Sequence, residues 1–292
     1  MRDLYADYIR QIGVIDPLRR EMHIGLGCAV ENMILATQAE GFDAQVDLLP
    51  DSKYVYHVAH LALTPAARPQ ASDLYPVIPR RHTNRGPYDH SKSVGSSVSG
   101  FAESATRGRF GKVAIAAAEA LIADEQQSRD SSRWWRQGWS DVQTYRDGIT
   151  IDAQAFDTLT TVFGKMLPDL PRQQNDAIFV KNVRTVYVAT APVFGLIAVR
   201  EQDDNAQRMR CGQLWQRMHL WATLHELGMQ PLNQTSERAD RERQLGLDPV
   251  FGRALYDLVG SNDWFGIMPF RLGYPTRSAL ASPRRSVQEV LL

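Results

Sequence analysis

Apolar positions recur at helical spacing in three long stretches of the chain. In residues 23–40 they follow three- and four-residue steps that end at Gly41, which predicts an amphipathic helix with a glycine just after its end. Residues 101–127 predict a second helix with an alanine-rich centre. A third helix is predicted to begin after Asp203 or Asp204, either of which can serve as its cap, and to end near Gly228.

Strand-like patterns occur in three other stretches. Residues 54–63 alternate between two faces that are apolar except for His57 and His60. Because alternate residues of a strand point to opposite faces, the spacing places these histidines on opposite faces, where they cannot chelate one metal ion. Two further apolar, β-rich runs span residues 183–189 and 193–199.

The remaining stretches read as short helices, linkers and an insertion. Residues 1–22 predict one or two short helices, and the Ser- and Gly-rich residues 91–100 predict a linker. Residues 131–182 begin with half of the six tryptophans, interleaved with arginine, and end in a Pro-punctuated loop. Such a pattern can stack the bases of nucleic acid, but a helix that packs its aromatic face on the core is the commoner case. The insertion suits a lid over a ligand pocket.

Composition narrows the class of protein. The 292 residues suffice for one large domain or two small ones, and 43% are apolar. Lys plus Arg and Asp plus Glu both number 33, and this zero net charge argues against a nucleic-acid or membrane-surface protein. No apolar run approaches the roughly 20 residues of a membrane span, and the first residues are charged, so we expect a cytoplasmic protein. Cys28 and Cys211 lie in helix-like runs and are predicted to be buried hydrophobes.

The candidate chemistry lies in a basic cluster, residues 80–85, which follows the Pro-rich residues 75–79. Arginine presents a planar fork of donors that fits phosphate oxygens. The residue before a proline favours extended geometry, so we expect an extended approach to the cluster. In an extended chain Arg81, Thr83 and Arg85 share one face and form an anion clamp. The alternative is a solvated charge cluster in a loop.

Two segments carry a resemblance to a known family. Arg81-His82-Thr83-Asn84-Arg85 resembles the Arg-Arg-Ser-x-Arg element with which nitroreductases grip the phosphate and ribityl chain of FMN. Ser282-Pro283-Arg284-Arg285-Ser286-Val287-Gln288-Glu289-Val290-Leu291 resembles the closing tail of that family, which returns an arginine to the same phosphate. Both elements together are more specific than either alone, and the resemblance is strongest at residues 23–42, 76–90, 205–235 and 268–292.

The resemblance implies a fold. Nitroreductases are α+β proteins with a central, mostly antiparallel sheet flanked by helices. This chain looks most like the fused, dormancy-associated Acg-type proteins, which carry two degenerate nitroreductase halves as a pseudo-dimer. A faint repeat agrees with fusion: Leu35-Ala36-Thr37 precedes Gly41 as Trp221-Ala222-Thr223 precedes Gly228. We therefore expect a degenerate half at residues 1–75 and a second half at residues 76–292 that contains the lid-like insertion.

The resemblance also implies the site residues. One end of FMN, its phosphate and ribityl chain, is expected to bind to the basic cluster and the C-terminal tail. The other end, the isoalloxazine ring, is expected to lie against the loop of residues 230–233. The first half lacks a second Arg-x-Ser/Thr-x-Arg element, which predicts one FMN per chain. The residues implied for the phosphate end are Arg81, Thr83 and Arg85 with His82 beside them, completed by Arg284 with Arg285 as its substitute, and those for the ring are Pro231, Leu232 and Asn233.

The implied activity is that of an FMN-dependent oxidoreductase that uses NAD(P)H to reduce a nitroaromatic or quinone-type acceptor. Hydride transfer needs no acid or base side chain, so no catalytic residue is expected. If the lid excludes NAD(P)H, the chain instead stores or sequesters FMN. A third reading has no cofactor, with the arginines forming interface ion pairs. The expected partners are FMN, NAD(P)H and a small aromatic acceptor, and the expected state is a monomeric pseudo-dimer or a homodimer.

Overall fold

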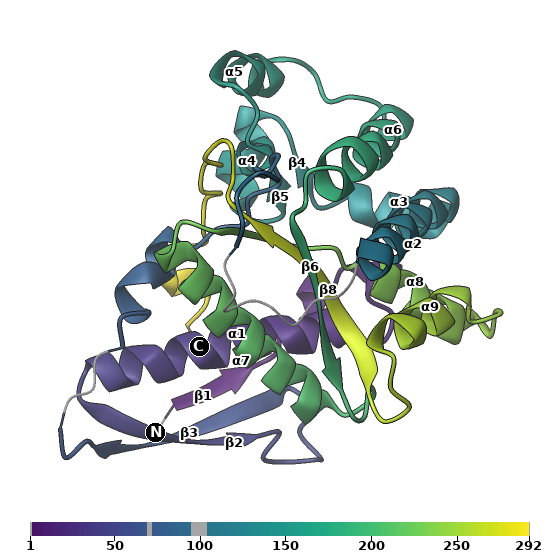
Figure 1. Cartoon of the computed structure of the whole chain (residues 1–292). Coiled ribbons are helices and arrows are strands. Elements are labelled where there is room, and N and C mark those ends of the chain that lie inside the picture. Colours follow the sequence, from purple (N-terminus) through teal and green to yellow (C-terminus); the bar gives the residue numbers. More distant parts are fainter. Residues whose placement is uncertain (1, 69–71, 95–103, 292) are drawn as a thin grey trace. The chain divides into compact units, whose positions relative to one another are not determined.

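The computed structural model describes residues 2–68, 72–94 and 104–291, which form two compact units (Figure 1). Each unit gathers segments that are far apart in the sequence. The predicted division at residues 75/76 into two contiguous halves stays a prediction. Unit 1 comprises Met1–Arg81, Leu196–His225 and Ala239–Pro269, and unit 2 comprises His82–Gly195, Glu226–Arg238 and Phe270–Leu292.

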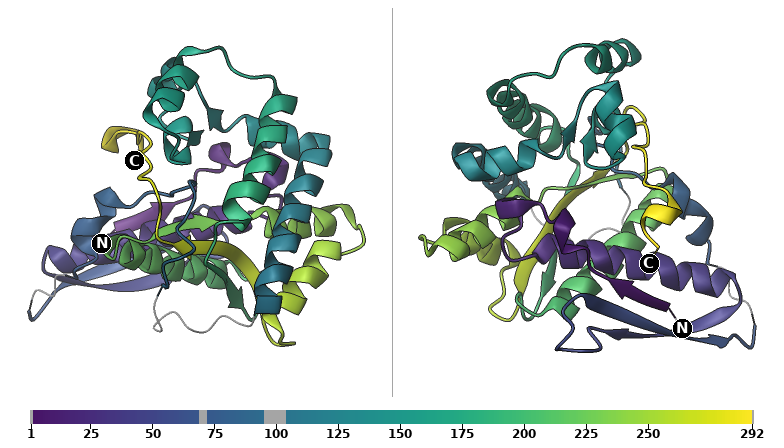
Figure 2. Two further views of the ribbon diagram at one scale, coloured as in Figure 1. Left: turned by 45° about the horizontal axis from the view of Figure 1, so that its top comes forward. Right: turned by 180° about the vertical axis from the view of Figure 1, so that it is seen from behind.

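Unit 1 is built on two long helices and a three-stranded sheet. Helices α1 (Arg20–Ala39) and α7 (Asn205–Leu224) lie side by side, as the views in Figures 1 and 2 agree. The sheet has the order β1-β3-β2, with both strand pairs antiparallel. Its inner face and the two helices share one apolar core. The strands are β1 (Arg2–Tyr5), β2 (Phe42–Leu48) and β3 (His57–Pro65), and the fully buried core residues are Val30, Val58, Ala59, Leu61 and Met209.

Glycines bring α1 and α7 into close contact. A Cβ atom at Gly27 would lie 2.0 Å from the carbonyl oxygen of Met209, and one at Gly212 would lie 1.9 Å from that of Ile24. Only glycine permits this approach of the two backbones. The two contacts are reciprocal. Gly212 occupies in α7 the position that Gly27 occupies in α1, 185 residues earlier, and Met209 corresponds to Ile24 by the same shift of 185 residues.

A polar pair on the same two helices repeats the relation. Arg217 is ion-paired with Glu31 at 2.5 Å, and Gln216 donates to Asn32 at 2.8 Å. Gln216 follows Glu31 by 185 positions and Arg217 follows Asn32 by 185. Each contact therefore has a counterpart in which the helices exchange roles, as in an isologous interface.

The other elements include a second three-stranded sheet of order β6-β8-β7 and a parallel pair, β4 with β5. The α+β class is confirmed, although the described strands form separate sheets and not one central sheet. The remaining strands are β4 (Trp135–Arg136), β5 (Ile149–Thr150), β6 (Val193–Val199), β7 (Gly228–Pro231) and β8 (Phe265–Gly273). The remaining α-helices are α2 (Ser104–Ala123), α3 (Glu125–Ser132), α4 (Trp139–Tyr145), α5 (Thr158–Met166), α6 (Arg172–Asn182), α8 (Gln234–Leu245) and α9 (Val250–Val259). Short helical turns are η1 (Tyr8–Arg10), η2 (Gly13–Ile15), η3 (Tyr75–Arg80), η5 (Ile151–Gln154), η6 (Val183–Val188) and η7 (Val287–Glu289).

The long helices agree with their sequence patterns. Helix α1 is followed by Gly41 with a φ of +81°, and Asp204 caps α7 by accepting from the backbone N–H of Ala206 at 2.8 Å. Both cysteines are free thiols; Cys211 is buried, as predicted, but Cys28 is only half-buried. Burial raises the pKa of each thiol, Cys28 and Cys211, to about 12, so neither is poised to react as a thiolate.

Several local predictions are wrong. Residues 183–189 are not a strand, because α6 continues into them as a π-helical turn that buries Val183 and Tyr187. The approach to the basic cluster is the 3-10 helix η3 and is not extended. Residues 1–22 contain strand β1 as well as short helical turns. The Ser- and Gly-rich linker falls partly on residues 95–103, outside the described residues.

The prediction for the two histidines of β3 is also wrong. Strand β1 pairs Leu4 with Ala59 but Tyr5 with His57, so Val58 is an extra residue on β3. This bulge interrupts the alternation, and the consecutive Val58 and Ala59 both point inward with no exposed area. His57 and His60, on either side of the bulge, consequently share the opposite face.

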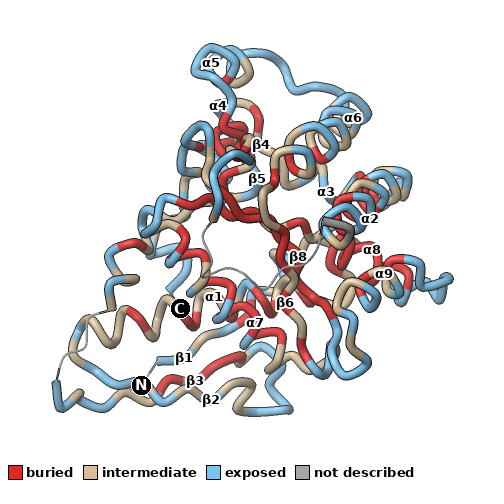
Figure 3. The backbone as a smooth tube through the Cα atoms, viewed as in Figure 1, coloured by how far each residue is buried: buried red, intermediate tan, exposed pale blue. Residues whose placement is uncertain are grey.

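The insertion at residues 131–182 belongs to unit 2 and contains the whole of α4, α5 and α6. Figure 3 shows α5 mostly exposed, although one side of this helix is apolar. None of the described helices is long and apolar enough to cross a bilayer. The exposed apolar side chains of α5 are Leu159, Val162, Phe163 and Met166.

Candidate functional site

The C-terminal part of the basic cluster is held rigidly within unit 2. Asn84, only 4% exposed, accepts from the backbone N–H of Gly86 at 2.9 Å and donates to the carbonyl of Arg277 at 2.8 Å. The hydroxyl of Tyr88 donates to the carbonyl of Asn84 at 2.9 Å. The backbone N–H of Arg85 donates to Ala153 at 3.1 Å. These bonds set the direction in which the Arg85 side chain leaves the backbone.

Arg271 of β8 ties this segment to its neighbours. Its side chain has no exposed area, and it donates to the Gln230 side chain and to the Gly86 carbonyl, each at 2.7 Å. The guanidinium also lies over the rings of Tyr88, at 4.0 Å, and Tyr187, at 4.8 Å. Arg271 thus links three segments, namely Gly86 just after the basic cluster, β7 and η6, and each of these contacts is to an uncharged group.

Arg85 lies beside Arg271 and the same two tyrosines. Burial lowers the pKa of both guanidinium groups, and for Arg271 the charge of Arg85 adds to this lowering. Burial also raises the pKa of Tyr88 to about 12 and that of Tyr187, so both phenols stay neutral. Within the described part of the chain, no carboxylate pairs with either arginine. A half-buried cation, Arg85, beside a fully buried one, Arg271, without a counter-charge favours an anionic ligand.

The adjoining loop holds polar atoms that the protein leaves unsatisfied. Pro231 ends β7 opposite Phe270, and Leu232 is fully buried. The side-chain oxygens of Asn233, Gln234 and Ser236 are buried and have no hydrogen-bond partner. Since buried polar atoms are nearly always bonded in native proteins, three such oxygens at the start of α8 fit a ligand that carries donors. A flavin ring system offers both donors and acceptors at its edge.

The structure brings together part of the predicted site. Gln230 accepts from Arg271, which lies beside Arg85, so the loop and the cluster meet in unit 2. The chain after β8 also runs along the cluster, because Thr276 donates to Pro87 at 3.0 Å and Asp89 donates to Tyr274 at 2.8 Å.

The other predicted residues are divided between the two units. Arg81 is the last residue of unit 1, where its charge acts on the Cys28 thiol. His82 and Thr83 are half-buried, Arg284 is exposed, and Arg285 lies near Glu289. No bond among the described residues links either tail arginine to Thr83 or Arg85. A shared phosphate clamp therefore stays a prediction.

Arg271, Tyr88 and Tyr187 were not expected from the sequence, and Gln230 was expected only as part of the loop of residues 230–233. A signal for Arg271 exists, since it is the one charged residue in the apolar run of residues 265–272. A charged residue inside a buried strand needs fixed partners. Which groups those are depends on strand pairing and on η6.

An Arg271→Met variant is expected to lose about 3 kcal/mol of stability, because Gln230 and Gly86 would keep buried acceptors without a donor. Urea unfolding followed by tryptophan fluorescence measures the loss. Arg271→Lys is the matched variant, which keeps the charge but not the planar fork, and we expect a similar loss. Wild-type stability in the lysine variant would show that charge alone matters at this position.

Comparisons with known proteins give limited matches. No family model matches the chain. Two proteins of Mycobacterium tuberculosis, from strains CDC 1551 and H37Rv, are each 27% identical over 144 residues, and their names describe candidate NAD(P)H nitroreductases. Each match spans 45% of this chain and 42% of the relative, so less than half of either protein is compared.

Two solved structures are also similar. The FMN-dependent nitroreductase NfnB from Mycobacterium smegmatis, in complex with NADPH, is 14% identical with a TM-score of 0.41, covering 74% of this chain and 95% of that one. A nitroreductase-like family protein from Bacillus cereus is 14% identical with a TM-score of 0.31, covering 77% and 98%. At these TM-scores the superpositions do not establish a shared fold.

Proposed function

We propose that this chain is an FMN-binding, nitroreductase-like oxidoreductase that takes reducing equivalents from NAD(P)H. The observation that carries the proposal is Arg85, a half-buried cation without a carboxylate partner among the described residues. It lies beside Arg271, whose partner Gln230 leads into a loop with unsatisfied buried oxygens. The names of the M. tuberculosis relatives support the same assignment.

In this proposal the phosphate and ribityl chain bind to Arg85 and Thr83, and Asn233 meets the edge of the ring. FMN supplies the hydride chemistry when bound, while the protein supplies position and charge. Leu232, which is buried, and Pro231, which is half-buried, would lie beside the ring and keep water from one of its faces. Arg81, His82, Arg284 and Arg285 complete the proposed phosphate end.

We also propose that the chain is a fused pair of related halves, with one FMN per chain. The support is the reciprocal packing of α1 and α7, in which the contact of Gly27 with Met209 is matched by that of Gly212 with Ile24. A two-fold interface between two equal chains has this property by symmetry. A single chain shows the same reciprocal packing when its two helices occupy equivalent positions in two related halves.

The insertion at residues 131–182 is proposed to act as a lid. Its helix α5 leaves Leu159, Phe163 and Met166 largely exposed, and apolar faces of this kind are usually covered in a working state. If the lid closes permanently over the flavin, the chain would hold FMN without turnover.

An absorption spectrum of the purified protein tests the proposal, followed by anaerobic NADPH and then NADH. Flavin bands near one per chain that bleach with a nicotinamide are the expected result. Bands that only dithionite bleaches would identify a storage protein. Absence of bands after reconstitution with FMN would overturn the proposal, because Arg85 would then have another role.

A further inference from the structure

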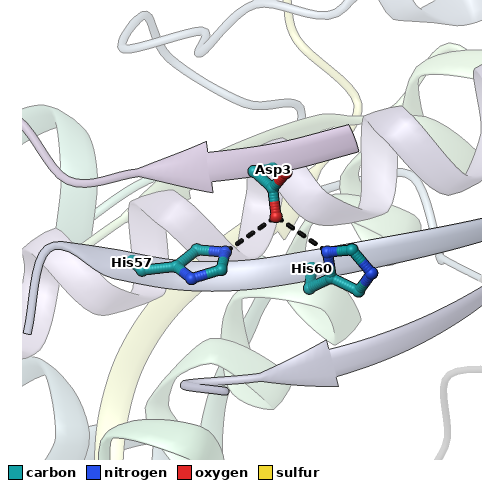
Figure 4. A group of neighbouring side chains, drawn as sticks. All are labelled: Asp3, His57 and His60. Carbon is teal, nitrogen blue, oxygen red and sulfur yellow. Dashed lines mark hydrogen bonds and ion pairs between the residues drawn. The ribbon is translucent and has the colours of Figure 1, made fainter. Parts of the chain in front are cut away.

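Unit 1 contains a cluster of two histidines and an aspartate on the open face of its sheet (Figure 4). One carboxylate oxygen of Asp3, in β1, lies 2.9 Å from Nε2 of His57 and 2.8 Å from Nδ1 of His60, both in β3. All three candidate ligand atoms lie within 4.8 Å of one another. The side chains are between 19% and 36% exposed, so ions in solution can reach them.

The cluster depends on the bulge at Val58. Without the extra residue, histidines three positions apart on a strand would point to opposite faces. With it, Val58 and Ala59 both enter the core and the two imidazoles turn to the same side. Bulges often re-aim side chains near functional sites.

The two distances from Asp3 to the histidine nitrogens suit neighbouring ligands of one metal ion. Imidazole nitrogen and carboxylate oxygen bind Zn²⁺ at about 2.0–2.2 Å, so two ligands of one ion lie about 2.8–3.1 Å apart at a right angle and about 3.3–3.6 Å apart at the tetrahedral angle. The two Asp3 distances match the right-angled arrangement, which first-row transition metal ions adopt when water completes their coordination. We propose that Asp3, His57 and His60 form a binding site for a divalent first-row transition metal ion such as Zn²⁺.

Neighbouring residues orient the ligands. The ring of Tyr5 stacks on His57 with centroids 4.9 Å apart and an angle of 24°. Strand β3 is the central strand, and His60 is paired with both β1 and β2, whereas His57 is paired with Tyr5 of β1. Asp47 of β2 pairs directly with His60 and brings a second carboxylate to the same face. Water can fill the remaining coordination positions, as in zinc sites with three protein ligands.

A cluster without metal has a different chemical description. In that case Asp3 accepts hydrogen bonds from the two imidazoles, and these bonds, that of His60 foremost, lower the pKa of the carboxyl group. The two descriptions differ in what an asparagine at position 3 does. Asparagine keeps an oxygen that accepts hydrogen bonds, but it is a far weaker metal ligand than a carboxylate.

The experiment is a titration of the full-length, tag-free protein with Co²⁺ after dialysis against EDTA, followed by displacement with Zn²⁺. Visible absorption of Co²⁺ bound to nitrogen and oxygen ligands reports the site directly. We expect one Co²⁺ per chain, displaced by one Zn²⁺. Asp3→Asn, His57→Gln and His60→Gln should each weaken binding at least about 10-fold. His90→Gln, which removes an exposed histidine of unit 2, is the matched control and should bind as wild type.

A second measurement does not depend on the variants. In the wild-type protein, Zn²⁺ should shift the NMR signals of two histidine rings and leave those of the others in place. The same addition should raise the melting temperature of the wild type and of His90→Gln, but not of Asp3→Asn. Unchanged ring signals, or equal Co²⁺ binding by wild type and Asp3→Asn, would overturn the proposal and leave a hydrogen-bonded cluster.

Discussion

An Arg85→Met variant is expected to bind FMN about 100-fold more weakly than the wild type, because a charge-assisted contact to phosphate contributes about 1.5–3 kcal/mol. Without ligand the same variant should be at least as stable as the wild type. The reason is that Arg85 is a partly buried cation whose charge no described carboxylate balances, so methionine removes a desolvation cost. Flavin fluorescence titration measures the affinity, and urea unfolding of the apoprotein measures the stability.

The expected loss of FMN affinity without a loss of stability distinguishes a ligand-binding role of Arg85 from a structural one. Arg253→Met is a suitable control, because it removes an exposed arginine of unit 1 that is paired with Asp248, and it should leave FMN affinity unchanged. A structural role for Arg85 predicts instead that stability and affinity fall together. That joint loss is the behaviour expected of Arg271→Met, whose guanidinium is fully bonded.

A Gly27→Ala variant is expected to lose about 3 kcal/mol of stability, the upper part of the usual range for overpacking. The added Cβ atom would lie 2.0 Å from the carbonyl oxygen of Met209 and 2.7 Å from its carbon. Both are backbone atoms of α7, so relief requires the two central helices of unit 1 to move apart. Urea unfolding followed by circular dichroism gives the free energy of unfolding.

Gly25→Ala is the matched control on the same helix. A Cβ atom there has no neighbour within 4 Å, so alanine should stabilise α1 by about 0.5–1 kcal/mol through its helix propensity. Equal effects of the two substitutions would contradict the close approach of α1 and α7. The reciprocal variant, Gly212→Ala, should lose as much stability as Gly27→Ala, because its Cβ atom would meet Ile24 in the same way.

The amino-acid sequence alone was enough to predict the features that depend only on residues close together in the chain. The apolar spacing of α1, its glycine stop and the Asp204 cap of α7 were all predictable, since a helix and its ends are set within a few residues. The burial of Cys211 followed from the same patterns, whereas Cys28 is only half-buried. The basic cluster was visible as candidate chemistry for the same reason, because three arginines and a hydroxyl lie within six residues.

The tertiary structure decided what depends on contacts between distant segments. The run at residues 183–189 has the β-branched composition of a strand, but burial of Tyr187 and the continuation of α6 make it helical. The bulge at Val58 arises from the pairing of β3 with β1, and it alone places both histidines on one face. The role of Arg271 exists only because β7, η6 and residue 86 meet around its guanidinium. Strand pairing and burial are long-range choices, so residue spacing could suggest the arginines of the candidate site but not the groups that hold them.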